Sequence, residues 1–328
     1  MYYYTDKRKR IILQENPLAS GGEGSIYLVK GGDLCAKIYR EENLSEDIKI
    51  ERYKKLKTMV AHPPRDLTHE HNKRIRTFAW PQALLYSNRY NHQTENFIGF
   101  LMPYIDTKQY VRFGKYLSDP AFNGRRSLYD LIAIICNLCT AVDQIHCNNH
   151  YIGDFREDNF LISPSEHFVV FLDCDSFQIT NPDNNEIYYC RFRDRSEYVA
   201  PELLTPEPAK YLDVHYSDLF ILGIIIFKML LGFHPFQCGG DGVGNNNSII
   251  EKIGAGLFPY GKNARDKKIH PPKWVKINYY DFLPESVKNL FYKCFVDGHD
   301  EPKKRPTANE WFNVFKEWGE ILEKAKRT

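Results

Sequence analysis

The sequence predicts an α+β fold of two lobes, a small antiparallel β-rich lobe with one long helix and a larger, mainly helical lobe after it. Residues 11–40 alternate short apolar runs with glycine, which is typical of antiparallel strands joined by tight turns. Residues 127–146 carry apolar side chains at helical spacing, and residues 217–232 are strongly apolar. The pattern changes near residues 102–106, so we expect one lobe over 1–105 and the other over 106–328.

The first lobe is expected to consist of a strand meander, a helix and further strands. The predicted strands are short apolar runs bounded by glycine or polar turns, and they are residues 11–13, 26–29, 34–39, 82–87 and 96–102. The charged stretch 45–60 favours a helix, and Pro63 and Pro64 stop it.

The second lobe is expected to be built from helices around two short strands. Residues 160–162 and 169–172 are apolar and bracket a turn at Pro164, which predicts the strand pair. The expected helices are residues 127–146, 217–232, 248–254, 285–296 and 307–324. Residues 239–247 are rich in glycine and asparagine and predict a surface loop.

The composition is that of an ordinary globular protein, with 43% hydrophobic and 26% charged residues. The net charge of +2 gives no electrostatic reason to expect nucleic acid or an anionic membrane as a partner. The most apolar run, Leu219–Phe233, is shorter than the roughly 20 residues that cross a bilayer. We expect no membrane span and a monomer or weak dimer.

The eight cysteines predict neither a zinc site nor disulfides. Only Cys136 and Cys139 are closely spaced, and no second pair stands at ligand spacing. Because no secretion signal is visible, we expect reduced thiols and a cytoplasmic protein. The alternative is that the protein is delivered to a host cell and acts there.

Two features of the first lobe suit phosphate binding. Gly21, Gly22 and Gly24 lie between two predicted strands, where glycine lets backbone N–H groups approach a phosphate closely. Lys37 lies on the next strand and should point opposite to Ala36 and Ile38. Either feature alone is also explained by a hairpin turn or a solvated lysine.

The second lobe adds the groups that phosphoryl transfer needs. Asp154 and Asn159 stand five residues apart in a loop after a helix, and Asp173 and Asp175 follow an apolar strand. Phosphoryl transfer uses four groups: a carboxylate that orients a hydroxyl, oxygen ligands for Mg²⁺, a cation on the phosphates and a glycine loop. The chain contains a candidate for each, in a workable order along the sequence. This combination favours function over chance turn residues.

With these motifs, the chain resembles the eukaryotic-like protein kinase superfamily from about residue 15 to residue 320. Further motifs support the resemblance: Ala200-Pro201-Glu202, an aspartate that opens the apolar helix (Asp218), and Arg305-Pro306, whose arginine should pair with Glu202. The resemblance implies a bilobal kinase fold, ATP with Mg²⁺ or Mn²⁺ as cofactors, and transfer of the γ-phosphoryl group to a serine or threonine of a protein substrate.

The resemblance also assigns roles to individual residues. Asp154 would accept the proton of the acceptor hydroxyl, Lys37 would hold the α- and β-phosphates, and Arg156 would keep a positive charge near the transferred group. Glu51 is expected to fix Lys37, with Glu46 as the alternative favoured by helical phase. The implied metal ligands are Asn159, Asp173 and, as an addition, Asp175. The implied nucleotide-binding residues are Gly21, Gly22, Gly24, Ile26, Ala36, Lys37, Met102, Pro103, Tyr104 and Leu161.

The chain also departs from the family pattern. Ala19 stands where the first loop glycine usually lies, and Gly153 replaces the arginine that holds a phosphorylated activation loop. We therefore expect an activation segment that is ordered without phosphorylation. Asp173-Cys174-Asp175-Ser176-Phe177-Gln178 replaces Asp-Phe-Gly and resembles a divergent bacterial kinase branch. The alternatives to a Ser/Thr kinase are a pseudokinase or nucleotide-gated interaction module, an adenylyl transferase and a small-molecule kinase.

Overall fold

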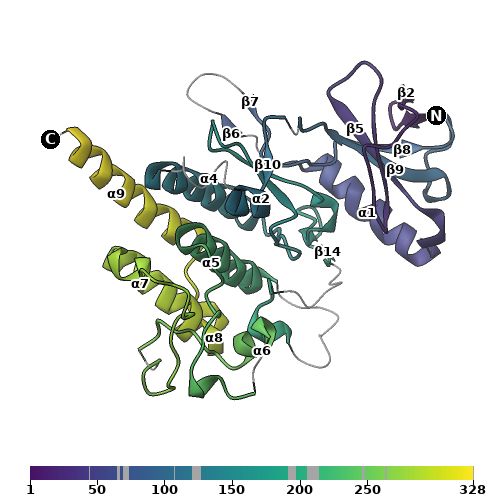
Figure 1. Cartoon of the computed structure of the whole chain (residues 1–328). Coiled ribbons are helices and arrows are strands. Elements are labelled where there is room, and N and C mark those ends of the chain that lie inside the picture. The colour runs from purple at the N-terminus through teal and green to yellow at the C-terminus, as the bar shows by residue number, and fades with distance from the viewer. Residues whose placement is uncertain are drawn as a thin grey trace. The chain divides into compact units, whose positions relative to one another are not determined.

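The computed structural model describes the chain apart from residues 44, 65–66, 69–73, 107, 120–126, 191–196, 205–213, 246–247, 263 and 328 (Figure 1). The chain forms two compact units. Unit 1 contains Met1–Tyr110, Asn148–His150 and Val170–Cys190, and unit 2 contains Val111–Cys147, Tyr151–Val169 and Arg191–Thr328. The units are therefore not the continuous 1–105 and 106–328, because two later segments belong to unit 1.

Unit 1 is built on a seven-stranded antiparallel sheet of order β2-β1-β8-β9-β5-β4-β3. Its strands are β1 (Tyr2–Thr5), β2 (Arg10–Ile12), β3 (Ala19–Ser20), β4 (Gly24–Leu28), β5 (Leu34–Tyr39), β8 (Ala83–Tyr86) and β9 (Phe97–Pro103). Strand β1 was not expected; it pairs with both β2 and β8. The basic run before β2 forms the turn of the β1–β2 hairpin, where Arg8 has a φ of 59°.

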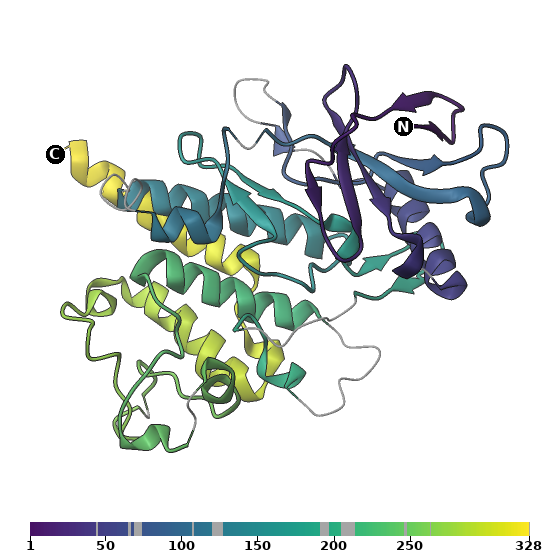
Figure 2. The same cartoon turned by 45° about the vertical axis from the view of Figure 1, so that its right-hand side comes forward.

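One face of this sheet forms an apolar core, and helix α1 (Glu46–Ala61) packs near β8. The core cluster consists of Ile11, Leu13, Val29, Ala36, Leu85 and Leu101. Leu56 and Met59 are buried on α1, and the indole N–H of Trp80 donates to the Met59 carbonyl oxygen at 2.8 Å. Figure 2 shows α1 beside the curved sheet.

The end of strand β12 (Val169–Phe171) and the segment after it belong to unit 1, and Phe171 pairs with the chain that precedes β8. Ala79 donates its N–H to the Phe171 carbonyl oxygen, and Phe171 donates to Thr77 O, both at 2.8 Å. Within unit 1 the segment continues through a 3-10 turn, Cys174–Ser176, to the hairpin β13 (Ile179–Thr180) and β14 (Ile187–Tyr188). A second small hairpin joins β6 (Leu67–Thr68) to β7 (Arg74–Ile75).

Unit 2 is a helical body around α5 (His215–Leu231), most of whose residues are buried. Helix α4 (Leu128–His146) starts with a capping box between Ser127 and Asp130, and it lies beside α9 (Ala308–Arg327) (Figures 1 and 2). The other α-helices of the described part of unit 2 are α2 (Phe113–Ser118), α6 (Ile249–Gly254), α7 (Glu285–Tyr292) and α8 (Gly298–Asp300), with a π-helix over Lys293–Asp297 between the last two. Strands β10 (Val111–Arg112) and β11 (Phe160–Ile162) pair antiparallel.

The described residues contain a single helix, α4, that by length and composition could cross a membrane. Eight of its residues, including Ile132, Ile135 and Leu138, are buried, and the helix packs against α9 within unit 2. The run Leu219–Phe233 lies largely in α5, where it is buried as expected.

The α+β class predicted from the sequence is confirmed, with an antiparallel sheet in one unit and a mainly helical second unit. The predicted helices at 45–60, 127–146, 217–232, 248–254 and 307–324 all form within a few residues of their expected bounds. The helix expected over 285–296 instead changes to π-helical geometry at Lys293.

Candidate active site

The residues predicted to carry chemistry fall into two groups, one in each unit. In unit 1, Lys37 lies on β5 and is 7% exposed. Ala36 and Ile38 belong to the apolar core face, so alternation along the strand turns Lys37 to the other face, as predicted. A buried lysine needs compensating charge, and the structure provides it.

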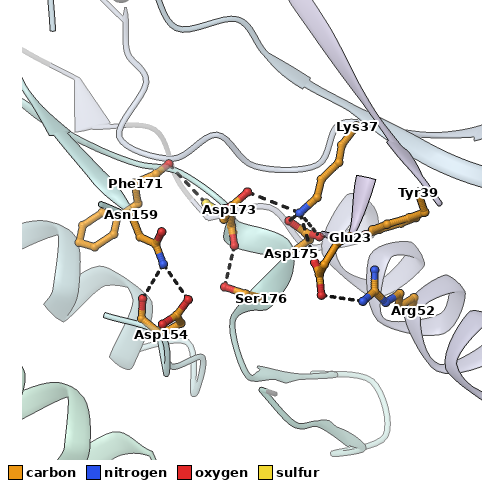
Figure 3. Close-up of polar contacts among 11 residues, drawn as sticks. Glu23, Lys37, Tyr39, Arg52, Asp154, Asn159, Phe171, Asp173, Asp175 and Ser176 are labelled. Carbon is orange, nitrogen blue, oxygen red and sulfur yellow. Dashed lines mark hydrogen bonds and ion pairs between the residues drawn. The ribbon is translucent and has the colours of Figure 1, made fainter. Parts of the chain in front are cut away.

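Three carboxylates contact the Lys37 ammonium (Figure 3). Nζ donates to both carboxylate oxygens of Asp175 at 2.8 Å, and it lies 3.5 Å from Oδ1 of Asp173 and 3.7 Å from Oε2 of Glu23. The Tyr39 hydroxyl also donates to Asp175, at 2.9 Å. Asp175 therefore makes the shortest contacts with Lys37.

The electrostatics of this cluster keep its acid and base charged. Burial by itself lowers the pKa of Lys37, but the charges of Asp175, Asp173 and Glu23 outweigh burial and raise it above its ordinary value. Burial likewise opposes ionisation of Asp175, yet Lys37 and the Tyr39 hydroxyl hold its pKa below the ordinary range. Burial and the neighbouring Asp175 raise the pKa of Tyr39, so it stays a hydrogen-bond donor.

Asp173 differs from Asp175 in exposure and backbone. Its side chain is 49% exposed, whereas that of Asp175 is 6% exposed. Asp173 has left-handed dihedrals, φ 49° and ψ 37°, and its carbonyl oxygen accepts from the Ser176 hydroxyl at 2.8 Å. The intervening Cys174 is buried, and burial raises its thiol pKa, so it is a packed side chain rather than a reactive thiol.

Helix α1 presents cations to this cluster. Arg52 donates to Oε1 of Glu23 at 2.7 Å and lies over the Tyr39 ring, with 4.5 Å from Cζ to the ring centroid. Lys55 is also buried, and burial lowers its pKa to about 8.

The expected pairing of Glu51 with Lys37 is not what the structure shows. Glu51 is exposed on α1, as is Glu46, and the carboxylates described on Lys37 come from Asp175, Asp173 and Glu23. The physical reason is the face of α1 that turns inward, which carries the cations Arg52 and Lys55.

The glycine-rich turn joins β3 and β4. Gly21 donates its N–H to the Gly24 carbonyl oxygen at 2.9 Å, which closes the turn. A Cβ added at Gly21 or Gly22 would meet nothing within 4 Å, so side chains there would not clash with the protein. At Gly24 a Cβ would lie 2.3 Å from the Ile38 carbonyl oxygen, so β5 itself requires this glycine.

The remaining nucleotide-binding candidates of unit 1 lie on its central strands. Met102 and Pro103 end β9, where Pro103 accepts from the Cys35 thiol at 3.5 Å and Tyr104 donates its N–H to Asp33 O at 2.8 Å. Ile26 pairs with Lys37 across β4 and β5. Two further candidates are packed: Ala36 in the unit 1 core and Leu161 on β11 of unit 2.

The second group lies in the loop before β11 of unit 2. The amide nitrogen of Asn159 donates to the Asp154 carbonyl oxygen at 2.8 Å and to its carboxylate Oδ2 at 2.9 Å (Figure 3). Nε of Arg156 lies 3.4 Å from Oδ1, and the Asp154 side chain is 43% exposed. This arrangement fixes a carboxylate that is open to a reactant. It brings together Asp154, Arg156 and Asn159.

A buried aspartate of α5 holds the start of this loop. Asp218 accepts from the N–H of Ile152 at 2.6 Å and from that of Gly153 at 2.9 Å, and Nε2 of His146 lies 3.1 Å away. Gly153 has a φ of 70°, where a side chain is strained. The glycine that replaces the family's arginine therefore also fits the backbone here.

Sequence reasoning missed a polar cluster in unit 2. Lys228 donates to Glu197 at 2.9 Å and to the Tyr198 hydroxyl at 2.5 Å, and Tyr198 donates to Glu157 at 2.6 Å. The sequence signal was Lys228 itself, a single charge within the apolar helix α5. Since Glu157 lies three residues after Asp154, the cluster connects the loop before β11 to the segment that precedes Pro201.

The predicted pairing of Arg305 with Glu202 is confirmed. Nη1 and Nη2 of the buried arginine donate to the two carboxylate oxygens at 2.6 and 2.7 Å. Arg305 also donates through Nε to Gly298 O at 2.7 Å, so this bidentate pair joins the segment after Ala200 to the chain before α9.

Each unit by itself offers one donor group that suits a magnesium ion. Mg²⁺ usually takes one or two carboxylates and completes its shell with water and phosphate oxygens. Asp173 offers an exposed carboxylate, and both described hydrogen bonds of the Asn159 side chain use its nitrogen, which leaves the amide oxygen as a donor to a cation. The described residues hold no group of three or more His, Cys, Asp and Glu side chains suited to a metal.

The comparisons with known proteins agree with this constellation. A family model described as protein kinase domain matches residues 78–315. The chain is 25% identical over 291 residues to a putative ribosomal protein S6 kinase alpha-2 of Caenorhabditis elegans, which is 87% of this chain and 33% of that protein. It is 25% identical over 247 residues to the serine/threonine-protein kinase SCH9 of Saccharomyces cerevisiae, covering 75% of this chain and 26% of that protein.

A shorter match, 28% identical over 116 residues, is to 3-phosphoinositide-dependent protein kinase 1 of Rattus norvegicus and covers 35% of this chain and 19% of that protein. The chain thus spans about a third or less of the length of these relatives. Because the family model covers more than half of its residues, the chain belongs to the eukaryotic-like protein kinase superfamily.

Proposed function

We propose that the chain is an ATP-dependent serine/threonine protein kinase that transfers the γ-phosphoryl group to a hydroxyl of a protein substrate. The observation that carries the proposal is the Asp154 carboxylate, which is half exposed and held by Asn159 and Arg156. Membership of the kinase superfamily and relatives named as serine/threonine kinases support it.

In the proposed reaction, unit 2 supplies the group that receives the proton. Asp154 accepts a hydrogen bond from the acceptor hydroxyl, orients its oxygen for attack and takes its proton. Asn159 fixes the carboxylate through its amide nitrogen and offers its oxygen to a metal. Arg156 adds positive charge beside Asp154, where charge builds up on the transferred group.

Unit 1 supplies the groups that hold the nucleotide. Lys37 binds the α- and β-phosphates, and Asp173 ligates the metal with its exposed carboxylate. Mg²⁺, when bound, neutralises charge on the phosphates. The N–H groups of the Gly21–Gly24 turn cover them, and Met102–Tyr104 lies against the adenine.

The segment from Asp173 to Gln178 supports assignment to a divergent bacterial branch of the superfamily, because Asp-Cys-Asp stands where Asp-Phe-Gly is usual. For this whole protein we propose a cytoplasmic location and a monomer or weak dimer.

The test uses ATP labelled separately at the γ and the α position, incubated with the full chain, Mg²⁺ and a protein acceptor. We expect label from γ only, on serine or threonine. Asp154→Asn should slow transfer by about 10²-fold or more while nucleotide affinity stays within about twofold, because a general base is removed but no phosphate ligand. Label from α would show adenylyl transfer, and nucleotide binding without any transfer would show a pseudokinase.

A further inference from the structure

Asp175 makes contacts that a metal ligand would have to give up. Both of its carboxylate oxygens accept from Lys37 at 2.8 Å, and one also accepts from the Tyr39 hydroxyl at 2.9 Å. The side chain is 6% exposed. A two-point contact of this kind fixes the direction of an ammonium group as well as its charge.

The neighbouring Asp173 has the opposite properties. It is half exposed, and its nearer carboxylate oxygen lies 3.5 Å from Lys37. The two aspartates are separated by the buried Cys174 in a 3-10 turn closed by the Ser176 N–H on Asp173 O at 2.9 Å. One short turn therefore leaves one carboxylate half exposed at the edge of the lysine and buries the other directly on it (Figure 3).

The inward face of α1 carries cations. Arg52 binds Glu23 of the glycine-rich turn, and the buried Lys55 interacts with the charge of Asp175. A glutamate of α1 is thus replaced as the partner of Lys37. The carboxylates of Glu23, Asp173 and Asp175 contact Lys37, and Glu23 also accepts from Arg52.

We propose that Asp175 is the positioning residue of Lys37, and that this chain has moved that task from helix α1 to the turn after β12. The inference rests on the proposed function, since it gives Lys37 its phosphate-binding role. It also gives the two aspartates different roles: Asp173 binds the metal, and Asp175 acts only through Lys37.

The test compares Asp175→Asn, Asp175→Glu and Asp173→Asn in the full chain, measuring kcat, KM for ATP and the Mg²⁺ concentration that gives half-maximal rate. Asp175→Asn should lower kcat/KM for ATP by about 10²-fold, because a misplaced group costs about that much. Asp175→Glu keeps the charge and should recover most of this loss. Asp173→Asn should raise the Mg²⁺ requirement, and Asp175→Asn should not.

A double-mutant comparison tests whether Asp175 acts through Lys37. Adding Asp175→Asn to Lys37→Ala should cause little further loss, because residues that act as a unit are not additive. The matched control is Asp183→Asn, an exposed aspartate of the same segment that pairs with His62, and it should stay within about twofold of the wild type. Circular dichroism checks folding. If Asp175→Asn does not fold, Tyr39→Phe, which removes one hydrogen bond from Asp175, should still lower kcat/KM several-fold.

Several outcomes would overturn the inference. The first is wild-type kinetics in Asp175→Asn or, where that variant does not fold, in Tyr39→Phe. The second is an Mg²⁺ requirement of Asp175→Asn that rises as much as that of Asp173→Asn. The third is a larger loss of kcat/KM in Glu51→Gln than in Asp175→Asn. The proposed function fails separately, if the wild type transfers no γ-phosphate. In that case the affinity for a fluorescent ATP analogue tests the inference, which requires Asp175→Asn to bind the analogue as weakly as Lys37→Ala does. A wild type that binds no nucleotide overturns both the inference and the proposed function.

Discussion

At the residue scale, His234 is a buried imidazole whose two nitrogens both have fixed partners. Nδ1 accepts from the Phe236 N–H at 3.2 Å, so the ring is neutral and Nε2 donates to the Glu197 carbonyl oxygen at 3.1 Å. Burial, with the nearby Lys228 charge as a second cause, lowers the pKa of His234 to about 3. A proton on Nδ1 would face an N–H group and break the first contact.

This histidine should make the protein less stable in acid. An unfolded histidine titrates near 6.5, so below that pH the unfolded state binds a proton that the folded state refuses, and stability falls as the pH drops toward about 3. Between pH 6.5 and 5 the cost is about 2 kcal/mol. Urea unfolding of the wild type and His234→Asn at several pH values measures it. The asparagine variant should show the flatter pH dependence, and parallel curves would contradict the assignment.

Asp173 carries a second prediction at this scale. Asp173→Ala should abolish most Mg²⁺-dependent transfer, by about 10²-fold or more, because it removes an exposed carboxylate that we assign to the metal. Rates measured over a range of Mg²⁺ and Mn²⁺ concentrations check it. If neither Mg²⁺ nor Mn²⁺ restores full activity, the result agrees with the loss of a metal ligand. Wild-type rates at ordinary Mg²⁺ concentrations would show that the ligand lies elsewhere.

At the scale of elements, a glycine on each of the two strands next to β5 lets that strand's backbone lie close to the backbone of β5. A Cβ at Gly24 of β4 would lie 2.3 Å from the Ile38 carbonyl oxygen, and one at Gly99 of β9 would lie 2.0 Å from the Lys37 carbonyl oxygen. Both clashes are with backbone, which cannot rotate away. The strand that carries Lys37 is therefore held between two close backbone contacts.

Gly99→Ala should consequently affect stability and activity together. We expect a loss of about 1–3 kcal/mol, as in overpacked cores, and a lower kcat/KM because β5 shifts with its lysine. Gly32→Ala, outside the proposed nucleotide-binding residues, is the control, since an added Cβ there has no neighbour closer than the Leu34 nitrogen at 4.0 Å. Thermal unfolding and ATP-dependent transfer are measured on both. Equal stability of the two variants would show that β5 accommodates the methyl group.

The elements also show what the sequence could and could not predict. Long periodic segments such as α4 and α5 were predicted because apolar spacing alone specifies a helix. The first strand, Tyr2–Thr5, was missed because its pairing partners β2 and β8 stabilise it from elsewhere in the chain. The partner of Lys37 was assigned by family spacing, and the contact with Asp175, 138 residues away, depends on the tertiary structure.

At the scale of the whole chain, the segment after β12 belongs to unit 1 and is ordered by contacts that involve no phosphate. The Thr180 hydroxyl donates to Asn149 O at 2.7 Å, and its N–H donates to Nδ1 of His150 at 3.3 Å. Tyr188 is buried, and its hydroxyl donates to Glu186 at 2.8 Å. Residues 191–196, which include three arginines (Arg191, Arg193 and Arg195) and Ser196, lie outside the described residues.

These contacts predict activity without phosphorylation of the segment. A phosphate on Tyr188 would stand beside the Glu186 carboxylate, and one on Thr180 would lose a hydrogen bond to the backbone, so modification there disrupts rather than orders. Phosphatase-treated protein should transfer phosphate within about twofold of untreated protein, since the contacts described for Thr180 and Tyr188 form without a phosphate. Variants that remove the hydroxyls of Thr180, Tyr188, Tyr189 and Ser196 are assayed beside it. An inactive dephosphorylated protein that recovers on autophosphorylation would require a cationic pocket for the phosphate, in place of the arginine that Gly153 replaces.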